Sequence, residues 1–521
     1  MLKSTSVVGG MTLLSRILGL LRDIAFAKYF APGVGMDAFL VAFKIPNFMR
    51  RLFGEGAFSQ AFVPVISEYK TTREQAEVKQ LVDGVAGVFG LLLLAVTVIG
   101  VAGAPLLVMV FAPGFIDDGD KFELTVSLLR ITFPYLFFIS LTAFAAGILN
   151  TYGRFGVPAF TPVLLNVSLI LAAVVFAGQS AEPVSALAAG VFIAGLLQLI
   201  LQLPFLARIG LLPVPRWRAA RDGVRKIMRL MLPALFGSSV AQINLLIDTL
   251  IASFLVTGSV SWLYFSDRLM EFPLGVFAIA LATVILPSLS ERHAEKSAAE
   301  FSATLDWALR LVCLLGIPAA IGLLVLAGPM LATLFQYGEF TARDVRMAEA
   351  SLMAYAFGLF GFTLIKVLAP GYFARQDTKT PVRFGVYAMF VNITLNLVLV
   401  VWLVRSEFFA PHAGLALATS LAALLNGCLL FLGLRRRGVY QPGGGWFLLM
   451  LRVLSANAVM AAALWYLKGD LQVWIGLSAP ERAARLAAFV IGGGLLYGAS
   501  VLALGLRPRH FKSPITRGAS V

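Results

Sequence analysis

Charged residues are scarce in this sequence of 521 residues: 13% are charged, whereas 59% are hydrophobic. A soluble domain usually has about 25% charged and about 45–50% apolar residues. This composition excludes an ordinary soluble protein, and the mean hydropathy of +0.87 agrees with that exclusion. The sequence therefore predicts an all-α polytopic membrane protein.

Cysteine, histidine and the motifs of nucleotide or metal chemistry are also rare or missing. Cys313 and Cys428 stand in separate apolar runs, which excludes a disulfide framework and a Cys-x-x-Cys metal site. The three histidines lack metal-ligand spacing, and no GxxxxGK(S/T), HExxH or nucleophile elbow occurs. We therefore expect that the protein is not an enzyme, hydrolyses no ATP, has no dedicated metal site and needs no cofactor.

Long apolar segments, by contrast, fill most of the chain. A spanning helix needs roughly 20 mostly apolar residues, and about 14 segments meet that requirement. The first is expected to be retained, because Arg16, Arg22 and Asp23 interrupt it and no signal-peptide cleavage site follows. The expected spans lie near residues 6–30, 36–66, 84–111, 125–151, 158–177, 184–206, 230–256, 262–289, 305–335, 348–373, 382–403, 413–433, 446–467 and 486–505.

The net charge of +15 is distributed unevenly over the loops between these spans. With the N-terminus in the cytoplasm, roughly 24 cations fall in cytoplasmic segments and about 7 on the opposite side. The connection from Arg208 to Arg229 is the most basic of the cytoplasmic segments. This bias predicts an even number of spans with both termini in the cytoplasm.

Three segments of the first half reappear in the second half, in the same order and about 225 residues later. The matched pairs are AFVPVISE with VILPSLSE, APLLVMVFAPGF with GPMLATLFQYGEF, and LLNVSLIL with FVNITLNL. A unit of six helices returns the chain to the same side, so both copies have the same orientation. We expect two pseudo-symmetric six-helix lobes around a central cavity. The lobes would cover residues 1–212 and 213–440, and residues 441–521 would form two C-terminal helices and a cytoplasmic tail.

Some charged side chains fall at membrane depth, where each costs at least about 2.5–3.5 kcal/mol on insertion scales. They cluster on adjoining faces of the first, second and eighth expected spans, with one in the tenth. The cations are Arg16, Arg22, Lys44, Arg50, Arg51, Arg268 and Lys366, and the acids are Asp23, Glu55, Asp267 and Glu271. Interhelical ion pairs explain the acids and part of the cations, but the surplus of cations needs an anion. Because arginine's planar fork suits phosphate and carboxylate, we favour an anionic substrate.

A second polar group lies in apolar surroundings and has a weaker signal. One carboxylate together with amide and hydroxyl oxygens can hold Na⁺ or carry a proton. Hydrogen bonding between helices explains the same residues equally well. The members of this group are Asp248, Asn392, Asn396 and Thr419.

Three segments of the sequence are distinctive: SRILGLLRD at 15–23, the segment from Asp37 through KIPNFMRRLFGEGAFSQAFVP at 44–64, and SDRLMEFP at 266–273. They resemble the MurJ/MviN family, the lipid II flippases of the multidrug/oligosaccharidyl-lipid/polysaccharide exporter superfamily. The resemblance extends over essentially the whole chain. It implies that the last two helices form a groove for the lipid tail. It also implies a multi-pass protein of the bacterial inner membrane.

The resemblance also implies a substrate and the residues that bind it. The substrate would be lipid II, the anionic undecaprenyl-pyrophosphate-linked muropeptide, which moves from the cytoplasmic to the periplasmic leaflet for cell-wall synthesis by alternating access. The family's cavity arginines match Arg16, Arg22, Arg50 and Arg268, with Lys44 and Arg51 as secondary attractors. The accompanying acids of the family match Asp37, Glu55 and Asp267, and the charge pattern of the first span adds Asp23 as a supporting acid. Expected partners are membrane lipids and the cell-wall synthesis machinery, with no nucleic acid.

Several alternatives stay open on the sequence. A flippase for another lipid-linked oligosaccharide fits the composition equally well, whereas a multidrug/cation antiporter of the same superfamily would need an acidic or aromatic cavity. A scaffolding membrane protein would tolerate neutral substitutions of its buried cations. Some relatives look acidic where this chain has Asn396, so coupling to Na⁺, to H⁺ or to the membrane potential is equally open.

Overall fold

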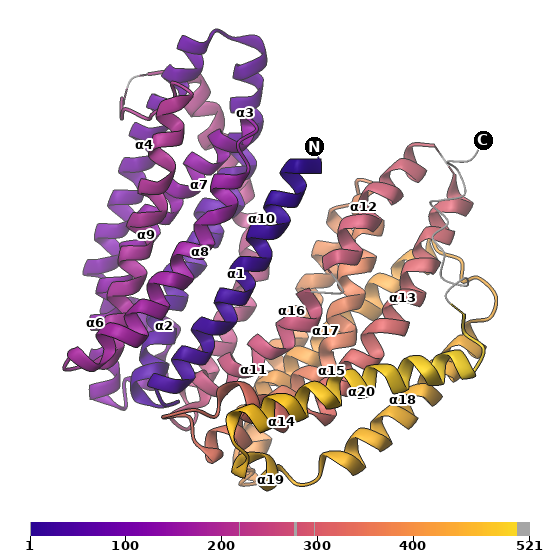
Figure 1. The fold of residues 1–521 in the computed structure, drawn as a ribbon. Coiled ribbons are helices and arrows are strands. Elements are labelled where there is room, and N and C mark those ends of the chain that lie inside the picture. The colour runs from indigo at the N-terminus through magenta and orange to yellow at the C-terminus, as the bar shows by residue number, and fades with distance from the viewer. Residues whose placement is uncertain (1, 218, 276–278, 296, 508–521) are drawn as a thin grey trace. The chain divides into compact units, whose positions relative to one another are not determined.

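The computed structural model describes residues 2–217, 219–275, 279–295 and 297–507. All regular structure in these ranges is helical, and no strand occurs in them (Figure 1). The all-α prediction is therefore confirmed. The chain divides into two compact units, which are described separately: unit 1 comprises Met1–Ser261 with Tyr337–Phe340, and unit 2 comprises Trp262–Gln336 with Thr341–Val521. The expected lobe boundaries and their pseudo-symmetry stay predictions.

Unit 1 is a bundle in which α1 packs against α8, α7 against α9, and α10 against the π-helix η1 and α3. Its elements are α1 (Leu2–Tyr29), α2 (Val34–Arg50), η1 (Arg51–Phe58), α3 (Ser59–Thr72), α4 (Gln75–Ala102), α5 (Ala104–Phe111), the 3-10 turn η2 (Pro113–Phe115), α6 (Gly119–Thr132), α7 (Tyr135–Thr151), α8 (Gly156–Leu171), the π-helical η3 (Ala172–Phe176), the 3-10 turn η4 (Ala177–Gln179), α9 (Pro183–Arg208) and α10 (Arg221–Ser253).

Unit 2 is built around α15, which packs against α13 and α17, while α16 packs against α17 and α18 against α20. Its elements are α11 (Ser259–Pro273), which begins in unit 1, α12 (Ile279–Ala294), α13 (Ala298–Val325), α14 (Ala327–Phe335), α15 (Ala342–Phe373), α16 (Lys379–Arg405), α17 (Ala413–Arg436), α18 (Trp446–Lys468), α19 (Leu471–Gly476) and α20 (Ala479–Ala503).

Ten helices in the described ranges are long and apolar enough to cross a membrane. They comprise α4, α6 joined to α7, α8 extended through η4, α9, α13, α15, α16, α17, α18 and α20. The other four expected spans coincide with α1, with α2 to α3, with α10, and with α11 to α12. Three of these four contain the charges that the sequence places at membrane depth, apart from Lys366 on α15. The multi-span architecture is confirmed, and the count of about 14 stays a prediction.

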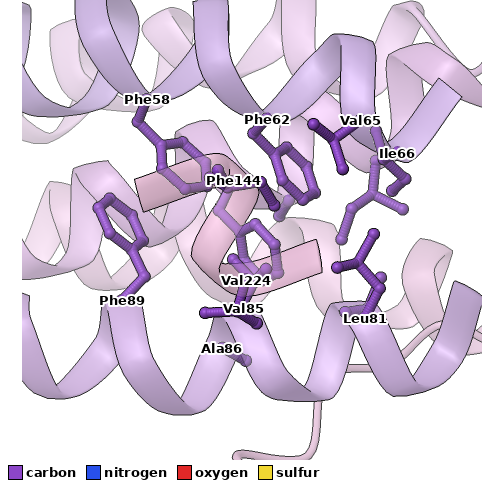
Figure 2. Packing of buried hydrophobic residues seen from close by; sticks show 14 of the residues in the cluster. Phe58, Phe62, Val65, Ile66, Leu81, Val85, Ala86, Phe89, Phe144 and Val224 are labelled. Carbon is purple, nitrogen blue, oxygen red and sulfur yellow. The ribbon is translucent and has the colours of Figure 1, made fainter. Parts of the chain in front are cut away.

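An aromatic core supports the segment in which these charges lie. Phe58, the last residue of η1, stacks on Phe89 of α4 with ring centroids 4.0 Å apart and on Phe62 of α3 at 5.1 Å. Phe144 of α7 meets Phe62 edge-on at 5.0 Å. Figure 2 shows these four rings turned toward one another between the helices. Buried aromatic pairs contribute about 0.5–1.5 kcal/mol each beyond their area, so this cluster anchors the end of η1.

The second predicted span is not one regular α-helix. Pro46 lies inside α2 and Pro64 inside α3, and the eight residues between these helices form η1. Pi-helical turns are rare and occur frequently at functional sites. The π-helix η1 lies in the segment that contains the largest group of predicted site residues, so its position agrees with a functional role for this segment.

Candidate functional site

The first cationic cluster lies between α1 and α8 of unit 1. Arg22 is buried, and it donates to Asp23 Oδ1 from Nε at 2.9 Å and from Nη2 at 2.7 Å. Its Nη1 donates to Asn166 Oδ1 at 3.0 Å, and Asn166 in turn donates to the carbonyl oxygen of Ser15 at 3.0 Å. The guanidinium also lies 5.6 Å from the ring centroid of Phe26. A carboxylate, an amide and an aromatic ring therefore fix the orientation of this arginine.

Three further predicted cations lie on α2 and η1. Lys44 is half-buried and donates to the hydroxyl of Thr249 on α10. Arg50 donates from Nε to Asn47 Oδ1 at 2.9 Å, one turn earlier on its own helix. Arg51 opens η1 and is exposed. The structure thus places these cations along one stretch of unit 1, with Lys44 and Arg50 half-buried and Arg51 exposed.

Two other predicted residues of unit 1 are Arg16 on α1 and Glu55 in η1. Arg16 on α1 is exposed, and it forms no ion pair with any side chain that the structure describes. Its position two turns before Arg22 continues the cationic stretch toward the N-terminal end of α1. Glu55 belongs to the backbone of η1, and its side chain lies outside the described residues.

Asp37, a predicted supporting acid, is the centre of a buried hydrogen-bonded cluster in unit 1. Its side chain is 1% exposed and accepts from Lys121 Nζ of α6 at 3.0 Å. It also accepts from the backbone N–H groups of Gly258 at 2.7 Å and Ser261 at 2.9 Å, and from the Ser261 hydroxyl at 2.6 Å. One carboxylate therefore joins α2, α6 and the turn between α10 and α11, with a full set of hydrogen bonds.

In unit 2, the predicted residues lie on α11. Arg268 donates from Nη1 to Glu271 Oε2 at 2.9 Å, and its guanidinium lies 5.0 Å from the ring centroid of Tyr264. Its side chain is 37% exposed, and the neighbouring Asp267 is half-buried. Two residues before Arg268, Ser266 is buried against Ser351 of α15, with hydroxyl oxygens 2.9 Å apart. This hydrogen bond helps to fix the face of α11 that presents Arg268.

Buried polar contacts also fix the beginning of α11. Trp262 Nε1 donates to Asp344 Oδ1 at 2.8 Å, and the Trp262 ring lies 5.1 Å from that of His412. Burial lowers the pKa of His412 to about 4, although its hydrogen bond to the Met347 carbonyl opposes this shift. His412 is therefore neutral at physiological pH and serves as a packing partner of Trp262.

The predicted ion site is divided between the two units. Asn392 and Asn396 are fully buried on α16, and the Thr419 hydroxyl of α17 donates to Asn392 Oδ1 at 3.5 Å. Asp248 belongs to α10 of unit 1 and is half-buried. Among the described residues, no group of three or more His, Cys, Asp or Glu side chains is arranged to hold a metal ion.

Comparison with known proteins gives the family. The sequence model of the lipid II flippase MurJ family matches residues 26–484, which is most of the chain. The chain belongs to the lipid II flippase MurJ family. The probable lipid II flippase MurJ of Vibrio cholerae is 48% identical over 520 residues, which cover 98% of each chain.

Solved structures agree with membership in the MurJ family. A lipid II flippase MurJ in an inward closed conformation matches with a TM-score of 0.77 and 27% identity over 95% of this chain and 97% of that one. An inward-facing MATE transporter of the MOP superfamily matches with a TM-score of 0.66 and 15% identity, over 83% of this chain and 97% of that one. The second match shows a shared fold alone. The resemblance found in the sequence motifs is therefore confirmed at the level of the family.

Two residues of this MurJ family member contact the predicted site but were missed in the sequence. Asn166, the partner of Arg22, occupies the place in LLNVSLIL that Asn392 occupies in FVNITLNL, so the internal repeat marked it. Lys121, the partner of Asp37, is the only lysine in the segment PGFIDDGDKFE. The available signal was a single lysine in an acidic segment. From the sequence alone, such a lysine is indistinguishable from an ordinary surface residue, and only the structure shows that Lys121 is buried.

Proposed function

We propose that the chain is a lipid II flippase, a transporter rather than an enzyme. Its membership in the MurJ family carries this proposal. As a member, it is a multi-pass protein of the bacterial inner membrane, and lipid II and membrane lipids are its ligands. The substrate moves from the cytoplasmic to the periplasmic leaflet by alternating access, which supplies precursor for cell-wall synthesis.

The recognition step uses the surplus cations for the pyrophosphate and carboxylates of lipid II. The exposed Arg16 and Arg51 and the partly exposed Arg268 are the first attractors. Arg22 is oriented by Asp23 and Asn166, so its fork is already rigid when a phosphate arrives. Preorganisation of this kind reduces the entropy lost on binding. Arg50 and Lys44 add charge along α2, with Glu55 and Asp267 as orienting acids.

The step that returns the carrier needs a driving force. A positive charge that crosses the membrane gains roughly 2.3 kcal/mol per 100 mV of potential, so the cations of α1 and α2 would respond to the membrane potential. Coupling to Na⁺ or H⁺ at Asp248, Asn392, Asn396 and Thr419 is the alternative. Asn392 and Thr419 offer amide and hydroxyl oxygens within hydrogen-bond distance, which suits a hard cation.

Orientation and partners complete the proposal. Both termini lie in the cytoplasm, because the basic loops then follow the positive-inside rule. The cell-wall synthesis machinery, which consumes the flipped precursor, is the protein partner, and nucleic acid is not bound. A flippase for another lipid-linked oligosaccharide remains the second candidate, because its pyrophosphate would meet the same cations.

The experiment is depletion of the protein from its host, followed by measurement of the leaflet that holds lipid II. Loss of a flippase should trap lipid II in the cytoplasmic leaflet, and re-expression of this chain should return it to the periplasmic one. An impermeant reagent that attacks only periplasmic lipid II reports the distribution. Unchanged access to lipid II during depletion would refute the proposal, and trapping of a different lipid-linked sugar would favour the second candidate.

A further inference from the structure

A basic pocket of about 330 Å³ lies in unit 2, where the ends of four helices meet. Arg292 and His293 come from the end of α12, and Arg375 follows the end of α15. Arg437 follows the end of α17, and the first turn of α13 closes the remaining side. Among the residues that the structure describes, the lining contains three arginines and no acidic residue. In the proposed orientation, all these segments lie at the cytoplasmic surface of the membrane.

Two of the three arginines are held by carboxylates that do not line the pocket. Arg292 donates to Glu295 at 2.9 Å and to Glu300 at 2.8 Å. Arg437 donates to Asp377 Oδ2 at 2.6 Å. These pairs orient the two guanidinium groups and offset their charge.

Asp377 is ionised throughout the physiological pH range. Burial opposes its ionisation, but hydrogen bonds from Thr380 and Arg437 outweigh burial and lower the pKa of Asp377 to about 2. Arg437 is therefore matched by a full negative charge. Any net attraction of the pocket for an anion has to come from another of its side chains.

Arg375 supplies that attraction. It is half-buried and has no carboxylate within ion-pairing distance in the part of the chain that the structure describes. The N-terminus of α13 adds to it, because Ser297 and Ala298 line the pocket and the Ser297 side chain does not cap the first turn. Backbone N–H groups of a first helical turn and a guanidinium are both donors that suit phosphate.

Part of the pocket wall is apolar, because Phe301 and Val439 line the same pocket as the arginines. This apolar part indicates where the group that carries the anion would lie.

A comparable pocket of about 400 Å³ in unit 1 differs in charge, because Glu68 and Asp222 line it together with Arg73 and Lys226. Its Lys226 and Glu68 are paired at 2.6 Å, so it offers no surplus charge. The unit 2 pocket therefore differs from this unit 1 pocket in having no acid among its described lining residues.

We propose that this unit 2 pocket binds an anionic phosphate group at the cytoplasmic surface, through Arg375 and the first turn of α13. A phospholipid headgroup of the inner leaflet and a free phosphate share this chemistry. Basic pockets between spanning helices on the cytoplasmic side bind anionic headgroups in other membrane proteins. This site is separate from the lipid II cations on α1, α2 and α11.

The test compares binding of two probes to purified full-length protein by native mass spectrometry. The probes are phosphatidylglycerol, with phosphatidylcholine as the neutral reference, and inorganic phosphate. Arg375→Gln should weaken binding of the anionic probe roughly tenfold, because one charge-assisted contact is lost. Arg383→Gln is the matched control, since Arg383 is an exposed cation of α16 on the same side and does not line the pocket.

The two arms distinguish the sources of the phosphate. Loss confined to phosphatidylglycerol identifies a lipid headgroup, and loss confined to inorganic phosphate identifies a soluble anion; either supports the site. Equal binding by wild type and Arg375→Gln would overturn the proposal, as would equal weakening by Arg383→Gln. Both variants change exposed or half-buried side chains, and matching thermal unfolding curves establish that they fold.

Discussion

Replacing Arg22 with methionine is expected to abolish flipping, even when the charge of Asp23 is removed as well. The single variant deprives the buried Asp23 carboxylate of the guanidinium at 2.7 Å, which should cost about 3–5 kcal/mol of stability. It also removes the fork that we assign to the phosphates. Loss of two charge-assisted hydrogen bonds, at about 1.5–3 kcal/mol each, lowers the flipping rate by at least about a hundredfold.

The double variant Arg22→Met with Asp23→Asn separates these two effects. It restores electrical neutrality, so the thermal unfolding temperature should recover most of its loss while flipping stays absent. Growth after depletion of the native protein measures function, and unfolding in detergent measures stability. Arg130→Gln is the control, since it removes an exposed cation from α6 of the same unit. A double variant that supports growth would show that Arg22 only neutralises Asp23.

Replacing Asp37 with alanine is expected to lower the stability of the protein more than any exposed charge substitution. Lys121, which is 3% exposed, would be left as a buried cation without its carboxylate, at about 3–5 kcal/mol. The N–H groups of Gly258 and Ser261 would lose their acceptor as well, which adds about 1–3 kcal/mol for each group that stays dry. Thermal unfolding in detergent should report a decrease of at least roughly 3 °C.

The paired variant Asp37→Asn with Lys121→Met tests the origin of that loss. If the buried charge is the cause, the pair should be more stable than Asp37→Ala alone, because neither side chain is then charged. Glu77→Ala is the reference, since Glu77 forms an exposed pair with Arg73 at 3.6 Å that should contribute under about 1 kcal/mol. If Asp37→Ala and Glu77→Ala unfold at the same temperature, the interpretation that the buried cluster around Asp37 stabilises the protein is contradicted.

The sequence predicted the helical architecture because it depends on local properties. Apolar segments of spanning length are visible as such, and ten of them reappear as helices of sufficient length and hydropathy. Pro46 and Pro64 lie in the second expected span, where the structure places a π-helix between α2 and α3. The sequence also identified the cations of α1, α2 and α11. A charged side chain within an expected span costs free energy of insertion, so each one stands out in an apolar segment.

The partners of these cations could not be predicted, because they are distant in the sequence. Asn166 is 144 residues from Arg22, Lys121 is 84 residues from Asp37, and Thr249 is 205 residues from Lys44. Which face of one helix meets which face of another depends on rotation and depth, and hydropathy does not encode either. Charge counting therefore identified the cations, whereas only the fold shows which of them already have an orienting partner.

The most direct test of the central claim is the affinity of the purified protein for lipid II. The account predicts that Arg22→Met, Arg50→Gln and Arg268→Gln each weaken binding by roughly tenfold or more, because each removes a charge-assisted contact to phosphate or carboxylate. Arg130→Gln should bind as tightly as the wild type, and added salt should weaken the wild type. Undiminished lipid II binding by all three arginine variants would contradict the claim that these arginines recognise the head group.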